Sequence, residues 1–125
     1  MVNIQCVRNN LAPRTGRFFC VIVMVGGIFI SLFIMPVAQY CDGVREFALS
    51  NRTRIDCLTD KYAIEFDFAY KWAEAVGQSL QYAYATQRDP AISLILESGK
   101  DMRFVDILVP LCDTYGIKLV LIKNY

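Results

Sequence analysis

The sequence predicts a small α/β domain, in which a mixed β-sheet is flanked by helices, after an apolar N-terminal segment. Short stretches of alternating hydrophobicity, separated by turn residues, fill the first half of this domain. Two stretches with a period of 3.6 residues follow, and each precedes a short apolar run. The order is therefore β-β-β-α-β-α-β. Tight turns make the first three strands antiparallel, and helical crossovers add parallel strands.

The first forty residues have the composition of a membrane-directed segment. No charged side chain occurs in residues 18–40, and a helix needs roughly 20 apolar residues to cross a bilayer. Three arginines and no acid lie in residues 1–40, which places the start of the chain in the cytoplasm by the positive-inside rule.

We therefore expect residues 1–40 to be a signal peptide or a transmembrane anchor, with the membrane contacted through residues 18–38 unless they are cleaved. The domain of residues 41–125 is then exported. It is either anchored on the extracytoplasmic side (periplasmic or extracellular) or secreted. No clear small-residue cleavage site decides between a signal peptide and an anchor.

The cysteines also favour an exported domain. Cys41 and Cys57 lie on the expected exported side, and a disulfide closing a loop of about 15 residues stabilises a domain by about 3 kcal/mol. Two free buried thiols are the alternative. Cys112 lies on an apolar helix stripe and is expected to be a small hydrophobic side chain. The sequence contains no histidine, which excludes His-based catalytic triads and His metal ligands.

The expected elements are short and closely spaced. Strands are predicted at 44–49, 53–58, 62–66, 91–97 and 117–122, and helices at 68–86 and from Asp101 to Gly116. The continuous apolar run of the fourth strand is typical of a strand covered on both faces.

Each helix has an expected buried stripe. That of the first helix comprises Trp72, Ala75, Val76, Ser79, Leu80 and Ala83, and that of the second comprises Phe104, Ile107, Leu108, Leu111, Cys112 and Tyr115. Pro110 lies inside the second helix on the side away from this stripe, where it is expected to introduce a kink.

Acidic residues alternate on the third strand. Glu65 and Asp67 share one face of the sheet, and Asp56 on the neighbouring strand can lie near them. Carboxylates brought this close repel one another unless a divalent cation lies between them, and oxygen ligands suit Mg²⁺ or Mn²⁺. The alternative is an ordinary solvated strand face, with Asp67 capping the helix that follows.

The following helix adds three polar side chains on one flank of its buried stripe. At 100° per residue, Lys71, Gln78 and Tyr82 fall within about 40° of one another. A lysine beside a metal-bound acid can orient water or stabilise a developing phosphate charge. We therefore take these three residues together with the acids as the candidate site.

This pattern resembles the PD-(D/E)XK nuclease superfamily. The residues that carry the resemblance are Asp56, then Glu65-x-Asp67, then Gln78-x-x-x-Tyr82, which is similar to the Q-x-x-x-Y helix motif of the RecB-type branch. The similarity spans residues 41–125, most specifically 53–85, where the chain also looks like a group of small exported bacterial proteins.

The resemblance implies a restriction-endonuclease-like fold and metal-dependent hydrolysis of phosphodiester bonds in nucleic acid. It implies that Asp56 and Glu65 are metal ligands for Mg or Mn, that Gln78 and Tyr82 contact substrate, and that Glu46 is a candidate first acid. The family carries a lysine two residues after its acid, where this chain has Asp67. Lys71 would then be that lysine, displaced to the adjacent helix.

The charge balance of residues 41–125 counts against a nucleic-acid-binding protein. The three arginines of the N-terminal segment leave ten Lys/Arg for residues 41–125 against all twelve Asp/Glu, so the net charge there is −2. Such a balance does not indicate sequence-independent nucleic-acid binding. The sequence thus leaves two functions open: a metal-dependent nuclease outside the cytoplasm, and a catalytically inactive nuclease-fold module that binds a protein or envelope partner.

Overall fold

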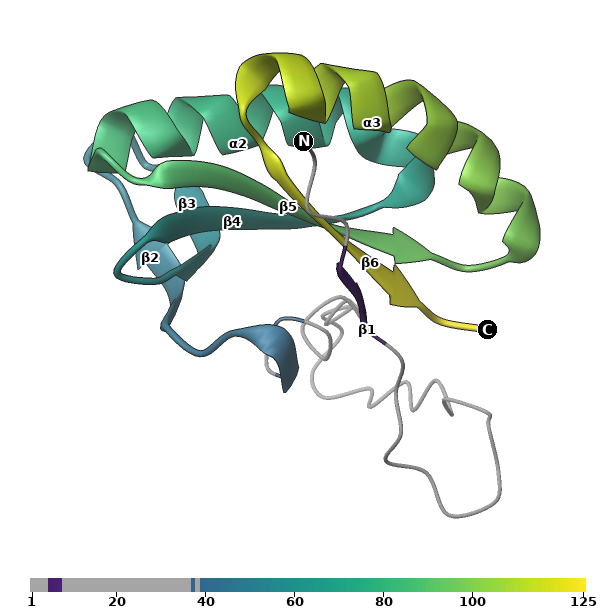
Figure 1. The fold of residues 1–125 in the computed structure, drawn as a ribbon. Helices are drawn as coiled ribbons and strands as arrows, with labels where there is room; N and C mark the ends of the chain where they lie inside the picture. The colour runs from purple at the N-terminus through teal and green to yellow at the C-terminus, as the bar shows by residue number, and fades with distance from the viewer. Residues whose placement is uncertain (1–4, 8–36, 38) are drawn as a thin grey trace.

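The chain forms one mixed β-sheet with two helices, in a computed structural model that describes residues 5–7, 37 and 39–125 (Figure 1). The sheet has six strands in the order β1-β6-β5-β4-β3-β2. The strands are β1 (Gln5–Val7), β2 (Val44–Ala48), β3 (Arg54–Leu58), β4 (Tyr62–Phe68), β5 (Asp89–Leu96) and β6 (Lys118–Lys123). The helices are α2 (Trp72–Thr86) and α3 (Met102–Tyr115), each preceded by a 3-10 turn, η1 (Ala69–Lys71) and η2 (Gly99–Asp101).

The predicted α/β class and the mixed sheet are confirmed. β2, β3 and β4 pair antiparallel, and β4, β5 and β6 pair parallel. Thr59 holds the tight turn between β3 and β4, since its hydroxyl accepts a hydrogen bond from the Tyr62 N–H at 2.8 Å. The expected boundaries were off by up to four residues, mainly because the end of β4 and the 3-10 turn η1 occupy the start of the predicted first helix.

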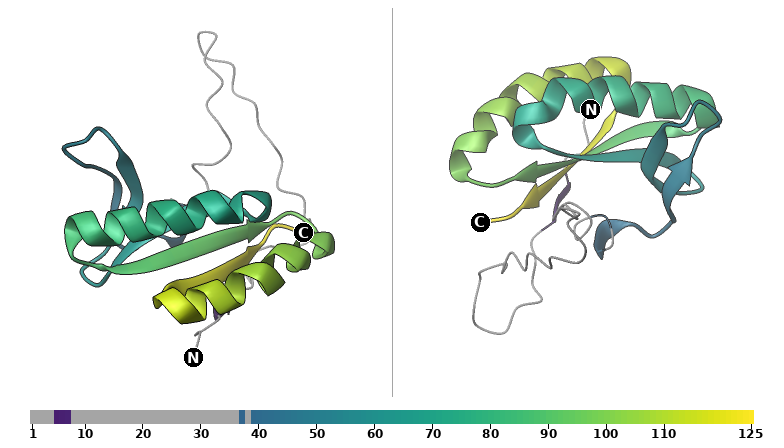
Figure 2. Two further views of the ribbon diagram at one scale, coloured as in Figure 1. Left: turned by 90° about the horizontal axis from the view of Figure 1, so that it is seen from above. Right: turned by 180° about the vertical axis from the view of Figure 1, so that it is seen from behind.

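The two helices lie on the same face of the sheet (Figures 1 and 2), and β5 is buried on both of its faces from Ala91 to Leu96, as its continuous apolar run predicted. Right-handed crossovers that advance in one direction, from β4 to β5 and then to β6, necessarily place their helices on one side. We call this side the helix face. The opposite face buries Phe66, Ile95 and Ile122 beside Val37, together with Cys57.

The main apolar core lies between the helices and the sheet. Ile92, Leu94 and Leu96 of β5 and Leu119 and Leu121 of β6 belong to it, together with buried side chains of both helices. The stripe predicted for α2 packs there, with Ala75 and Ser79 fully buried. Ser79 tolerates burial because its hydroxyl donates to the Val76 carbonyl at 3.0 Å.

The stripe predicted for α3 was partly wrong. Its buried residues are Val105, Leu108 and Cys112, whereas Ile107 is 46% exposed and Tyr115 is 57% exposed. Because α3 follows β5 and precedes β6, it lies near one side of the sheet and has only a narrow contact with it (Figure 1). A narrow contact covers one row of side chains at i, i+3 and i+7, so the outer rows of an apolar helix stay exposed.

The predicted disulfide is confirmed, joining Cys41 to Cys57 with a Cα–Cα distance of 5.7 Å. It ties the segment before β2 to β3. Cys112 is a free thiol and buried, as expected for a small hydrophobic side chain, and burial raises its pKa to about 11. Gly43 lies between Cys41 and β2 where a Cβ would meet the Leu58 carbonyl oxygen, so the chain requires glycine at this close approach.

One strand was not predicted at all. β1 pairs parallel with β6, with Cys6 opposite Leu121. This strand belongs to the segment expected to be a signal peptide or a transmembrane anchor, so a domain exported in that way would lack this pairing with β6. The expected membrane-spanning residues, apart from Val37, lie outside the described part of the chain. Within the described part, no helix is long and apolar enough to span a bilayer.

A candidate carboxylate site

The candidate site lies on the helix face, where β3 and β4 meet the first two turns of α2. Three carboxyl groups are drawn together there, from Asp56 on β3 and from Glu65 and Asp67 on β4. Glu65 is 6% exposed and Asp67 is 4% exposed, so both are buried acids rather than residues of a solvated strand face. The solvated-face alternative is therefore wrong for Glu65 and Asp67.

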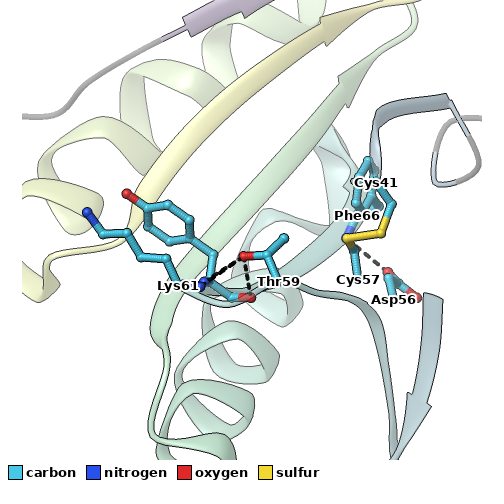
Figure 3. The surroundings of a disulfide bond; sticks show 7 residues. Cys41, Asp56, Cys57, Thr59, Lys61 and Phe66 are labelled. Atoms are coloured by element: carbon cyan, nitrogen blue, oxygen red, sulfur yellow. Dashed lines mark hydrogen bonds between the residues drawn. A yellow bond between two sulfur atoms is a disulfide. The ribbon is translucent and has the colours of Figure 1, made fainter. Parts of the chain in front are cut away.

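Asp56 ends the ladder between β3 and β4. The ladder runs through Cys57 opposite Ile64, and the next free backbone donor of β4, the Phe66 N–H, donates to Asp56 Oδ2 at 2.9 Å (Figure 3). Burial raises the pKa of Asp56, the Phe66 hydrogen bond lowers it, and the Asp67 charge raises it again. The carboxylate is thus fixed in place by the backbone that carries the other two acids.

Glu65 is the most perturbed acid of the site. Burial, which is the largest cause, and the charges of Asp56 and Asp67 together raise its pKa to about 9. Its side chain shares a hydrogen bond with Asp56, which raises the pKa of Glu65 and lowers that of Asp56. The other oxygen, Oε2, is buried and has no hydrogen-bond partner.

Asp67 does not cap α2, which corrects the alternative assigned to it. Its Oδ1 accepts a hydrogen bond from the adjacent Phe68 N–H at 2.9 Å, and α2 begins without any side-chain cap. Burial raises the pKa of Asp67, while the Phe68 hydrogen bond and the Lys71 charge lower it. Lys71 is therefore close enough to act on the acids, although its own side chain is exposed.

Gln78 and Tyr82 also reach the site from α2. Tyr82 was expected on the flank of the buried stripe. It is only 3% exposed, so it belongs to the core instead. Burial and the charges of Glu65 and Asp56 raise the Tyr82 pKa to about 12, and a hydrogen bond with Gln78 opposes this. Gln78 Oε1 is the second buried oxygen of the site without a hydrogen-bond partner.

Sequence reasoning missed one residue of the site, Glu74. Its charge raises the pKa of Glu65, Asp67 and Tyr82, so it faces all three from an exposed position on the first turn of α2. The spacing could have identified it, because Lys71, Glu74, Gln78 and Tyr82 follow one another at intervals of three or four residues along one helix side.

Glu46, the candidate first acid, lies at the margin. It is exposed on β2, where its φ of 50° is unusual for a residue other than glycine, and Arg54 Nη1 lies 3.6 Å from its Oε2. Its charge raises the Asp56 pKa, so it is near the acids. Because Arg54 already pairs with it, Glu46 is a peripheral charge and not a central member of the site.

A metal ion would find oxygen donors here but no ready-made cage. Among residues 5–7, 37 and 39–125, no three acidic or cysteine side chains are arranged to hold a metal ion. The donor set still suits Mg²⁺ or Mn²⁺, since Asp56 and Glu65 are in contact and the unpartnered oxygens of Glu65 and Gln78 are buried in the same site. Because burial and the neighbouring acids raise the pKa of Glu65, a cation would compete with a proton for this acid.

No family model matches the chain, and neither a curated protein nor a solved structure matches it. The nuclease resemblance therefore depends on the residues of this site and on the strand and helix order.

Proposed function

We propose that this protein is a metal-dependent nuclease-like hydrolase that cleaves phosphodiester bonds of nucleic acid outside the cytoplasm. The observation that carries the proposal is the meeting of Asp56, Glu65 and Asp67 with Lys71 and Gln78 on one face of the sheet. Antiparallel strands followed by a parallel crossover agree with a restriction-endonuclease-like fold. Function depends on such a site and not on the fold alone.

The charge and position of each site residue suggest a separate role in metal binding, phosphate contact or positioning. Asp56 and Glu65, with the Gln78 amide oxygen, would hold Mg²⁺ or Mn²⁺, which when bound supplies positive charge and an activated water. Lys71, exposed at the start of α2, would contact a phosphate oxygen, and Asp67 would orient that lysine. Gln78 and Tyr82 hydrogen-bond to each other and would fix the inner wall of the site.

The charge of the site makes metal binding the first requirement. Asp56, Glu65, Asp67 and Glu74 influence one another, and Lys71 is the one cation that acts on this group in the described structure. A phosphodiester is itself an anion, so it would be repelled from such a group. Binding of a divalent cation would reverse the sign of the local charge, and Glu65 would give up its proton as the cation binds.

A direct test combines metal binding with cleavage on the same preparations of the full chain. Calorimetry with Mg²⁺ and Mn²⁺ should detect binding at millimolar metal. Cleavage of DNA or RNA should require the metal and stop with chelator. Glu65→Gln should lower the cleavage rate by at least about 100-fold, the usual scale for loss of a group acting on the reacting atoms.

Glu97→Gln is the matched control, because Glu97 is an exposed acid that follows β5 and does not belong to the site. It should cleave like the unmodified chain. Equal cleavage by the unmodified chain and Glu65→Gln would exclude the proposed active site. Absence of metal binding would exclude metal-dependent chemistry at these acids.

A second candidate is the inactive nuclease-fold module that binds a protein or envelope partner. The burial of Glu65 and Asp67 favours it, because a substrate phosphate must reach carboxylates that are 6% and 4% exposed. In such a module the Asp56–Glu65 pair would persist as a protonated hydrogen bond. Calorimetry separates the two functions, since the module would bind neither Mg²⁺ nor Mn²⁺.

A further inference from the structure

A cavity of about 800 Å³ opens on the sheet face that the helices leave free. Ile64, Ser93 and Val120 line it from three neighbouring strands, and Ser93 and Val120 alternate along their strands with residues of the helix-face core. None of the acids of the carboxylate site lines this cavity, so it is a separate place on the molecule. Its volume is within the range of small-molecule sites.

The walls of this cavity are held in place by covalent and hydrogen bonds. Residues 39–44 form one wall, and the disulfide from Cys41 ties this wall to β3 (Figure 3). The turn between β3 and β4 forms another part of the rim, where the Thr59 hydroxyl accepts hydrogen bonds from the N–H groups of Lys61 and Tyr62 (Figure 3). The cavity is therefore largely preformed.

Two ammonium groups share one aromatic ring at this rim. Lys118 Nζ lies 4.5 Å and Lys61 Nζ lies 5.2 Å from the ring centroid of Tyr62. Since both distances end at one point, the two charges are within about 10 Å of each other, about one Debye length, and repel. Neither lysine forms an ion pair with an acid in the described part of the chain.

We propose that the cavity binds a small amphiphilic anion, with a phosphate or carboxylate head at the rim that carries Lys61 and Lys118 and an apolar body along Leu58, Ile64 and Val120. An anionic head relieves the repulsion between the two ammonium groups. The apolar side chains that line the same cavity accept a hydrocarbon body, which gains about fourfold in affinity for each buried methylene.

The acids of the cavity explain why the apolar body is required. Asp42 and Asp60 also line it, so the charge of the lining is balanced and a bare anion gains little Coulomb attraction. Inorganic phosphate should therefore bind weakly. Alkyl phosphates should bind progressively better as the chain lengthens, until the cavity is filled.

The experiment titrates the full chain, kept in a nonionic detergent, with inorganic phosphate, butyl phosphate and octyl phosphate, followed by calorimetry. We expect the affinity to rise in that order. The double variant Lys61→Gln/Lys118→Gln should lose at least about tenfold in octyl phosphate affinity, because the paired charge that holds the head is gone.

Lys123→Gln is the matched control, since Lys123 also lies over a tyrosine ring, that of Tyr125 at 6.0 Å, but does not line the cavity. It should bind octyl phosphate like the unmodified chain, and it corrects for partitioning of the probe into detergent. Val120→Phe, which fills the cavity without changing its charge, should also weaken octyl phosphate binding. A thermal unfolding curve of each variant establishes that it is folded.

Vesicles separate the two sources of such a head group. Binding to vesicles of anionic phospholipid, in competition with octyl phosphate, would identify the ligand as a lipid head group. Binding of octyl phosphate without binding of vesicles would identify a free metabolite of the same chemistry. Octyl phosphate affinity that is equal in the unmodified chain and in the folded double variant would overturn the proposal. Equal affinity for inorganic and octyl phosphate would overturn it too.

Discussion

Strands β4 and β5 lie side by side under α2, but they present opposite chemistry to it. In the parallel register Glu65 pairs with Ile92, and Asp67 pairs with Leu94. Ile92 and Leu94 are fully buried, and the two acids are nearly so. One helix thus covers an apolar strand and an acidic strand at the same depth.

The contrast shows that burial has opposite energetic consequences on the two strands. Removing Ile92 and Leu94 from water stabilises the fold, whereas removing Glu65 and Asp67 from water raises their pKa and opposes folding at neutral pH. The apolar strand therefore explains why α2 packs on the sheet. The acidic strand needs an explanation other than stability, and a trade between stability and function is a common one.

The largest expected effect comes from breaking the apolar strand. Leu94→Ala should lower the free energy of unfolding by about 2–5 kcal/mol, because a fully buried leucine leaves a cavity that its neighbours do not fill. Urea unfolding followed by circular dichroism measures this. Ile107→Ala is the control, since Ile107 is 46% exposed on α3, and it should cost well under 1 kcal/mol. Similar losses in both variants would mean that the helix–sheet contact is not the main core.

A smaller effect of opposite sign is expected from neutralising the acidic strand. Glu65 has a pKa of about 9 in the folded chain and an ordinary value of 4.5, so the folded state holds an extra proton between these limits. Its contribution to stability is thus fully present below about pH 4.5 and is lost as the pH rises toward 9. Glu65→Gln removes this loss and should raise the free energy of unfolding at pH 8 by on the order of 1–2 kcal/mol.

Urea unfolding at pH 5, 7 and 9 checks this prediction. The curves of the unmodified chain and of Glu65→Gln should diverge as the pH rises, with the variant more stable at high pH. Glu97→Gln, at an exposed acid, should follow the unmodified chain. Parallel pH profiles for the unmodified chain and Glu65→Gln would show that Glu65 is ionised in the folded protein, contrary to its burial beside Asp56.

The smallest effect concerns Lys71, whose charge acts on Asp67. The Lys71 charge lowers the pKa of Asp67, so Lys71→Gln should raise the Asp67 pKa, an effect that salt weakens because Lys71 is exposed. Carboxyl-carbon NMR titration measures it. Lys100→Gln, at an exposed lysine in η2, should leave the Asp67 titration unchanged. An unchanged Asp67 pKa in Lys71→Gln would place Lys71 outside the site.

Much of the site could be anticipated from local pattern. Residues two apart on a strand share a face, so the sequence predicts that Glu65 and Asp67 lie on the same face of the sheet. The three polar residues of α2 were aligned by the helical period in the same way. Glu74 obeys the same period and was overlooked. The raised pKa of Glu65 and the burial of Tyr82 were beyond such reasoning, because both depend on what packs above the strand.

The sequence by itself determined the order of strands and helices after residue 41, the antiparallel-then-parallel sheet and the cysteine pair, because these follow from periodicity, turn residues and loop length. Only the tertiary structure decided that both helices cover one face, that Ile107 stays exposed and Glu65 does not, and that β1 joins β6. Local periodicity indicates which side of a helix or strand is apolar. It does not indicate how much of that side a neighbouring element buries, because burial depends on contacts between residues far apart in the chain.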